Sequence, residues 1–117
     1  MLLNKERLFE NDKSFIVTHN VKGSSLKGWE AQYNENNTYR KQKRKNSVFV
    51  THELLSWHHR DAKNLTLKKM EAMTREYIKL RNPNGMYIAV PHFDKEHCHV
   101  HLCVSGVELK SGKVMRL

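Results

Sequence analysis

The chain has 117 residues, enough for one domain with a modest hydrophobic core. Its net charge of +9 at pH 7 predicts a polyanionic partner, and nucleic acid is favoured over a membrane surface because basic side chains supply affinity for phosphates whatever the sequence. No apolar run approaches the length of a membrane span, and the N-terminus turns charged at once, so neither a membrane segment nor a signal peptide is expected.

We therefore expect a cytoplasmic protein without a membrane partner. Cys98 and Cys103 fall in one predicted strand, where their geometry argues against a mutual disulfide, and both are expected to be reduced. Segment 112–117 reads as the beginning of a strand. We therefore interpret residues 1–117 as a single domain that is a fragment of a longer protein.

The first half of the chain predicts a strand, a short helix and a basic run. Segment 14–19 is rich in residues that favour strands. Ser24 or Ser25 is a suitable N-cap for a short helix that runs from Leu26 through Tyr33 and ends at the Asn-rich segment 34–37. The basic run follows within 39–45, and its cationic residues are Arg40, Lys41, Lys43, Arg44 and Lys45. Two interpretations of it stay open: a solvated surface, or a set of phosphate contacts.

The middle of the chain predicts a strand and a well-defined helix. Segment 47–57 carries apolar residues on both faces, which is typical of a strand in the middle of a sheet. Thr66 is a suitable cap for a helix over 67–81. The residues expected to form its core-facing stripe are Leu67, Met70, Met73, Tyr77 and Leu80.

The last third predicts a hairpin. Segment 86–91 is a strand, 94–96 makes a tight reversal, and 97–105 is the returning antiparallel strand. The predicted fold is α+β: a mostly antiparallel central sheet of about five strands with helices packed on one face. This arrangement is similar to the HUH and RRM folds.

The hairpin holds the most unusual chemistry of the chain. His97, His99 and His101 alternate along a strand and so share one face, while His92 lies just before the reversal. Crowded imidazoles repel one another when protonated, so a shared divalent cation explains the cluster. Two alternatives stay open. In the first, the histidines are solvated on an edge strand and bind no metal. In the second, Cys98 and Cys103 form part of a structural zinc site, although strand parity separates the two thiols.

The spacing His92-x-Asp94-x4-His99-x-His101 resembles the third motif of the plasmid relaxases, or mobilisation nucleases, within the HUH endonucleases. Segment 52–57 resembles the family's second motif, a strand that ends in Ser and an aromatic residue. The hairpin of 105–114 also looks like the one that follows the family's histidine pair. The resemblance covers roughly residues 46–117.

The resemblance implies a divalent metal held by His92, His99 and His101, with Mg²⁺ or Mn²⁺ expected and Ni²⁺ or Zn²⁺ as other bound species. Asp94 would orient an imidazole, and Ser56 would position DNA near the cut. His97 is extra to the family pattern. Strand parity lets only one of His52 and Glu53 face this site unless a bulge intervenes.

The nucleophile implied by the resemblance is a tyrosine that forms a phosphotyrosyl bond and frees a 3′-hydroxyl. The family usually carries it near the N-terminus, where this chain has no clear tyrosine motif. Tyr39, beside the basic run, is slightly favoured over Tyr33. A tyrosine beyond Leu117 is an open alternative.

The predicted function is therefore metal-dependent, site-specific and strand-specific nicking of single-stranded DNA at a transfer origin, which starts plasmid or mobile-element mobilisation together with accessory relaxosome proteins. One alternative is a rolling-circle replication initiator or a single-tyrosine transposase, which differs in where the tyrosine lies. A second alternative is a basic nucleic-acid-binding module without catalysis, although such sheets usually expose stacking aromatics rather than histidines.

Overall fold

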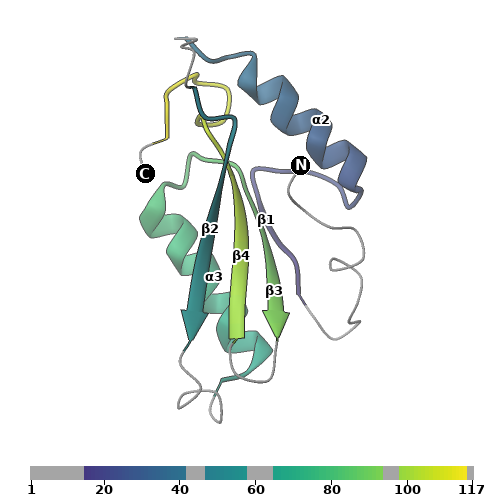
Figure 1. Ribbon diagram of the computed structural model, residues 1–117, viewed down its shortest axis with the longest axis vertical. Coiled ribbons are helices and arrows are strands. Elements are labelled where there is room, and N and C mark those ends of the chain that lie inside the picture. Colours follow the sequence, from purple (N-terminus) through teal and green to yellow (C-terminus); the bar gives the residue numbers. More distant parts are fainter. Residues whose placement is uncertain (1–14, 42–46, 58–64, 94–97, 116–117) are drawn as a thin grey trace.

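The computed structural model describes residues 15–41, 47–57, 65–93 and 98–115. In this part, four strands form one antiparallel sheet in the order β1-β3-β4-β2, and two helices pack against it (Figure 1). The elements are β1 (Val17–His19), α2 (Leu26–Asn37), β2 (Val50–Trp57), α3 (Leu67–Arg81), β3 (Tyr87–Phe93) and β4 (Cys98–Ser105). The α+β class and the antiparallel hairpin of β3 and β4 are confirmed.

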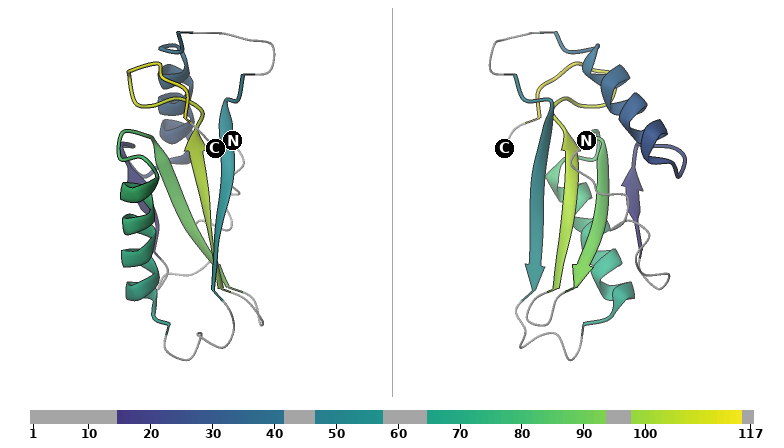
Figure 2. Two further views of the ribbon diagram at one scale, coloured as in Figure 1. Left: turned by 90° about the vertical axis from the view of Figure 1, so that its left-hand side faces the viewer. Right: turned by 45° about the vertical axis from the view of Figure 1, so that its right-hand side comes forward.

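Helix α3 covers one face of the sheet along its length (Figure 2). Thr66 caps it as predicted, because its Oγ1 accepts a hydrogen bond from the Lys69 backbone N at 3.1 Å. The residues that turn toward the sheet are Met70, Thr74 and Ile78, which recur every four positions. Met73 and Leu80 were expected in this stripe and are exposed, since they lie one helical step to its side.

The core beneath α3 is made of alternate residues of the central strands. These buried residues include Tyr87, Ala89, Val100, Leu102 and Val104. Since successive side chains of a strand point to opposite faces, the residues between them must lie on the other side of the sheet. Strand β4 therefore contributes one set of residues to the core and the alternate set to the second face.

Helix α2 packs on that second face, toward one end of the sheet (Figure 2). Its Trp29 and Tyr33 are buried with Ile88, Val90 and Cys103. Ser25, one of the two predicted caps, begins the helix, and its Oγ accepts from the Gly28 backbone N at 3.0 Å. Neither helix of the described residues has the length and apolar character that a membrane span requires.

Three expectations about the layers need correction. The helices lie on opposite faces of the sheet, because α2 and α3 pack against residues of opposite strand parity. The described sheet has four strands, and the expected final strand is reduced to an isolated bridge between Val107 and Val114. Strand β2 is an edge strand, whereas β3 and β4 are central, and its Leu54 on the second face stays exposed.

Candidate functional site

The second face of the sheet is open where α2 does not cover it. Among the described residues, most of the side chains that follow the buried α2 contacts along the strands are polar, with Leu54 as an apolar exception. On β2 these are His52 and Ser56, and on β4 they are His99 and His101. None of the four is buried, and His92 of β3 is also partly exposed. The alternation of side chains along the strands thus places imidazoles on the part of this face that α2 does not cover.

Strand register brings the three predicted metal histidines together. His92 pairs directly with His99 across β3 and β4, and His101 lies two residues further on the same face. The ring centroids of His92 and His101 are 5.7 Å apart, and those of His99 and His101 are 6.4 Å apart. The hairpin therefore gathers the three rings at one place.

Strand β2 adds two contacts to this cluster. The Ser56 Oγ lies 3.0 Å from Nδ1 of His99, and the His52 Nε2 lies 2.9 Å from Nδ1 of His101. The rings of His52 and His101 are stacked, with centroids 5.0 Å apart and planes 14° apart. In both contacts the β2 side chain engages Nδ1 of the β4 histidine, so Nε2 is the nitrogen of His99 and of His101 that is suited to bind a metal ion.

The donor chemistry of this cluster fits a divalent metal. Neutral imidazoles are common ligands of such ions, and a ligating histidine usually engages its other ring nitrogen with a neighbouring group. Rings bonded to one ion at about 2.1 Å would have centroids roughly 5 Å apart, a little less than the separations found here. Within the described residues no three His, Cys, Asp or Glu side chains already converge on one point, so the rings must rotate slightly to share an ion.

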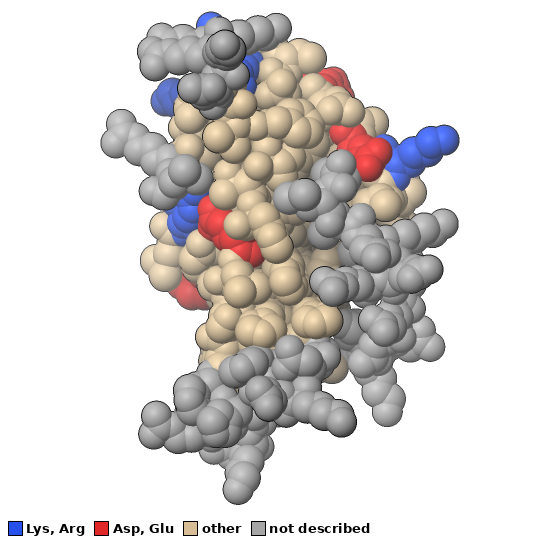
Figure 3. Space-filling view, in the orientation of Figure 1, with Lys and Arg blue, Asp and Glu red and all other residues tan. Residues whose placement is uncertain are grey.

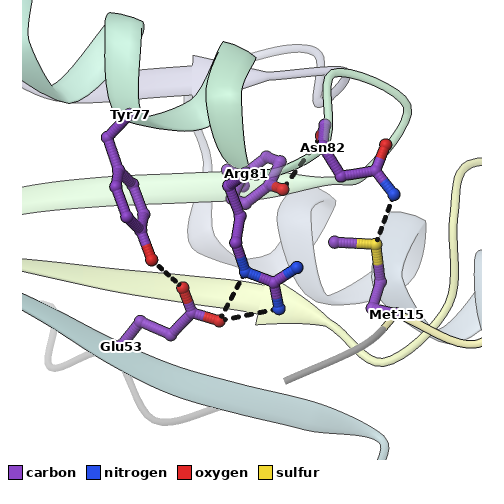
Figure 4. A network of polar contacts seen from close by, with 6 residues as sticks. Glu53, Tyr77, Arg81, Asn82 and Met115 are labelled. Atoms are coloured by element: carbon purple, nitrogen blue, oxygen red, sulfur yellow. Dashed lines mark hydrogen bonds and ion pairs between the residues drawn. The ribbon is translucent and has the colours of Figure 1, made fainter.

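Glu53 takes no part in this cluster, because it points to the opposite face of β2. Its Oε2 accepts hydrogen bonds from Nε and a terminal nitrogen of Arg81, at 3.3 and 3.1 Å, and Oε1 accepts from the hydroxyl of Tyr77 (Figure 4). The Glu53 and Arg81 side chains are each only 16% exposed. Glu53 therefore ties the edge strand to α3, and His52 is the residue of this pair that faces the histidines.

Tyr33, one of the two predicted nucleophiles, is a residue of α2 and is fully buried between this helix and the sheet. Its hydroxyl donates to the Cys103 carbonyl at 2.6 Å and lies 3.4 Å from the Met86 carbonyl. Burial raises the pKa of this phenol well above its ordinary value of 10. Cys103 nevertheless lies on the histidine face, two residues from His101, which is a step of about 7 Å along a strand.

Tyr39, the favoured candidate, lies far from the histidines. Its carbonyl oxygen would be 2.0 Å from a Cβ at Gly112, so the two backbones are in close contact. Its neighbour Arg40 donates to the Val48 carbonyl, and a Cβ at Gly106 would lie 2.8 Å from an Arg40 nitrogen. Gly106 is seven residues beyond His99, about 20 Å along β4. This distance along the strand counts against Tyr39, whose role as nucleophile stays a prediction.

Arg40 also needs correction as a DNA contact. Its side chain is only 7% exposed, and its Nε donates to Oδ1 of Asn37 at 3.2 Å. It holds the segment after α2 against the start of β2, which is a structural role. Lys41 is exposed. The other predicted cations, Lys43, Arg44 and Lys45, lie outside the described residues, as do Asp94 and His97.

His52 and Leu54 also belong to this face. The sequence left the role of His52 open and did not single out Leu54. His52, Leu54 and Ser56 have the same strand parity, so the assignment of Ser56 to the site already implied that the other two share its face. Leu54 is 52% exposed and pairs with His101. An exposed apolar side chain amid imidazoles provides a surface for a ligand with apolar parts.

Figure 3 has the orientation of Figure 1, in which α3 lies behind the strands. The described lysines and arginines that can be seen lie toward the upper end and the two sides of this view, and none is seen over the middle of the strands. A polyanion crossing this face would thus meet histidines at its centre and lysines or arginines at its edge.

The antiparallel sheet, with helices on both faces and clustered histidines on the part that α2 leaves open, agrees with the class that the sequence resembles, a nuclease domain. The family model for the relaxase MobA/VirD2-like nuclease domain matches residues 3–117, so the chain belongs to the relaxase family. Members of this family are DNA endonucleases that nick DNA in mobilisation. Comparison with curated proteins found no match, and comparison with solved structures found none either.

Proposed function

We propose that this domain nicks one DNA strand at a transfer origin by metal-assisted transesterification. The observation that carries the proposal is the set of three histidines that β3 and β4 bring together on the open face of a relaxase-family sheet. A divalent metal bound there would polarise a phosphate oxygen and stabilise the charge that develops during cleavage. His92, His99 and His101 are the ligands in this proposal.

The neighbours of these ligands have positioning roles. Ser56 and His52 each contact Nδ1 of a proposed ligand, and such contacts fix the orientation and tautomer of a metal-binding imidazole. Ser56 also faces the surface where DNA would lie, as the family resemblance implies. Asp94 keeps its proposed role as an orienting carboxylate. Lys41, Lys43, Arg44 and Lys45 remain proposed phosphate contacts, without Arg40.

Tyr33 is the better candidate for the nucleophile. It lies over the same face as the histidines and close to His101 along β4, whereas the Tyr39 backbone lies beside Gly112, in the turn that follows β4. The other two tyrosines are committed elsewhere, because Tyr77 donates to Glu53 and the Tyr87 hydroxyl donates to the Asn82 carbonyl at 2.9 Å. In this proposal the Tyr33 phenol leaves its two carbonyl partners when DNA enters beside α2. Attack on phosphorus by the deprotonated phenol forms the phosphotyrosyl bond and releases the 3′ oxygen.

The proposal is tested by trapping the covalent product. The protein is incubated with Mn²⁺ and single-stranded oligonucleotides taken from the neighbourhood of its coding region, and adducts are measured by mass spectrometry. We expect an adduct with the unchanged protein and with Tyr39→Phe, and none with Tyr33→Phe. An adduct that persists in Tyr33→Phe would reject this nucleophile, and peptide mapping of that adduct would identify the residue used.

Metal binding is measured separately, so that the two parts of the proposal fail independently. Equilibrium dialysis against Mn²⁺ or Ni²⁺ should show one ion per chain, and His92→Ala, His99→Ala and His101→Ala should each abolish that binding. Ser56→Ala and His52→Ala should weaken it by about tenfold, since each removes a positioning contact and no ligand. The absence of stoichiometric binding in the unchanged protein would refute the metal site.

A further inference from the structure

A groove of about 560 Å³ lies at the end of the sheet away from His99. It is bounded by α2, by the segment between β1 and α2, and by the turn that follows β4. Met86, on its floor, accepts a hydrogen bond from the Ser105 backbone N, six residues along β4 from His99. Along β4 the groove therefore lies about 20 Å from His99 and about 13 Å from His101. Its volume is within the range typical of ligand sites.

The backbone beside this groove is strained at two positions. Among the described residues, Asn20 and Lys110 are the non-glycine residues with positive φ, at 59° and 56°, and both line the groove. The Asn20 amide donates to the carbonyls of Pro83 and Gly85 at 3.1 and 2.8 Å, which holds its conformation. Strained residues persist only where the surrounding structure enforces them, and they gather at binding sites.

Lys110 is held in place by a buried asparagine. The side chain of Asn36, 3% exposed, accepts from the Lys110 backbone N at 2.7 Å. Its amide donates to the carbonyls of Val107 and Glu108 at 3.2 and 3.3 Å, and to the Ser105 Oγ at 3.3 Å. The turn after β4 is thus fixed to α2 before any ligand binds, and the Lys110 side chain projects from a rigid position.

The lining combines groups that suit a nucleotide. The Tyr39 ring is 43% exposed and can stack against a base, and the Lys22 and Lys110 side chains are exposed and cationic. Glu35 also lines the groove, and its carboxylate can accept from an N–H group of a base, such as N3–H of thymine. A simple anion would be repelled by Glu35, whereas a nucleotide offers a base to Tyr39 and Glu35 and a phosphate to the lysines.

We propose that this groove binds one nucleotide of the DNA strand, several nucleotides from the phosphate that is cut. This inference rests on the proposed function, because it assumes that the strand crossing the histidine face continues past α2. The groove then acts as a second anchor point, with the base against Tyr39 and its phosphate between Lys22 and Lys110. A free mononucleotide has the same chemistry, so the experiment must separate the two sources.

The test uses three probes: the oligonucleotide (dT)20, the four deoxynucleoside 5′-monophosphates, and inorganic phosphate. We expect (dT)20 to bind about tenfold more weakly to Tyr39→Ala than to the unchanged protein, and Tyr39→Phe to retain full affinity. NMR titration with (dT)20 should shift the backbone amides of Tyr39 and Lys110, and inorganic phosphate should not. An unchanged affinity of Tyr39→Ala for (dT)20 would overturn the proposal, as would micromolar binding of a monophosphate without binding of (dT)20.

A second variant protects the test against misfolding of Tyr39→Ala. Lys22→Gln with Lys110→Gln removes two charges from the rim and should reduce the slope of log affinity against log salt by one to two units. An unchanged slope would count against the groove. Adduct formation at the histidines does not use Tyr39, so the two proposals can fail separately. If adducts form but the groove variants bind (dT)20 normally, only the second anchor point is rejected. If the groove variants weaken binding but no adduct forms, only the cleavage proposal is rejected.

Discussion

Two neighbouring residues of β2, His52 and Glu53, show how differently the two faces of the sheet are used. Glu53 points toward α3 and is enclosed by Tyr77 and Arg81, so that both carboxylate oxygens accept hydrogen bonds (Figure 4). His52 points the other way, is exposed, and contacts another imidazole. Both are polar residues on one strand. The carboxylate of Glu53 is fully engaged by protein groups, whereas the histidine face remains accessible to a ligand.

This difference separates structural from functional polar groups. A partly buried ion pair is satisfied inside the protein and breaks only at a cost to folding. A cluster of exposed imidazoles on neighbouring strands contributes little to the core and crowds groups that repel one another when charged. We therefore expect substitutions on the α3 side to change stability, and substitutions on the open side to change chemistry.

The largest expected effect is on the open face. His99→Ala should reduce the rate of DNA cleavage by about 100-fold or more and leave the urea midpoint of unfolding nearly unchanged, because a proposed metal ligand is lost without loss of core packing. His19→Ala is the matched control, since His19 lies on the α3 side and contacts the Pro83 carbonyl at 2.7 Å. Equal cleavage rates in the two variants would show that the histidine face is not the reactive one.

The second effect belongs to the α3 face. Glu53→Ala should lower the free energy of unfolding by about 2 kcal/mol, because it leaves Arg81 partly buried without its carboxylate. Cleavage per folded molecule should stay the same. The measurement is urea unfolding followed by circular dichroism, together with a cleavage assay well below the midpoint. A loss of cleavage in the fully folded variant would mean that the two faces are coupled.

A third expected effect is a loss of stability at high pH, which comes from the buried tyrosine and cysteine side chains. Burial raises the pKa of Tyr87 from 10.0 to about 12 and that of Cys103 from 9.0 to about 11, and it also raises the pKa of Tyr33. The pKa values of these groups are higher in the folded protein than in the unfolded chain, so the fold favours their neutral forms. The stability linked to this difference is fully present at neutral pH and is lost as pH rises from about 9 toward 12. The urea midpoint should fall over that interval, and less steeply in Tyr33→Phe. A midpoint that is constant from pH 8 to 11 would contradict the burial of these groups.

The smallest effect tests whether the enclosure of Glu53 matters. Glu71 and Arg75 also form an ion pair, at 3.2 Å, but it lies on the exposed surface of α3 with side chains 35% and 54% exposed. Glu71→Ala should lower the free energy of unfolding by only about 0.3 kcal/mol, because solvent screens the pair. A loss as large as that in Glu53→Ala would show that enclosure is not what strengthens the Glu53 contacts.

Local patterns in the sequence were enough to predict the helix caps, the β3–β4 hairpin and the gathering of His92, His99 and His101. These features depend on residues close together in the chain, whose geometry is set by strand parity and capping chemistry. The spacing of the histidines was thus informative without a structure.

Features that depend on packing between distant segments were not predicted. The position of β2 at the sheet edge and the division of the helices between two faces follow from which strand meets which helix, and the sequence pattern does not encode that directly. The preference for Tyr39 rested on a local pattern of this kind. A tyrosine beside a basic run seemed suited to gathering a phosphate, but Arg40 and Gly106 hold that segment at the far end of the sheet.

Strand β4 carries Val100, Leu102 and Val104 toward α3 and His99 and His101 toward the opposite side. Core and reactive groups are thus interleaved residue by residue on a single central strand. Insertion or deletion of one residue within it would exchange the two sets, placing imidazoles in the core and aliphatic side chains in solvent. Over evolutionary time the loops of such a domain can change length freely, whereas this strand can vary in composition but is barred from changing its length by a single residue.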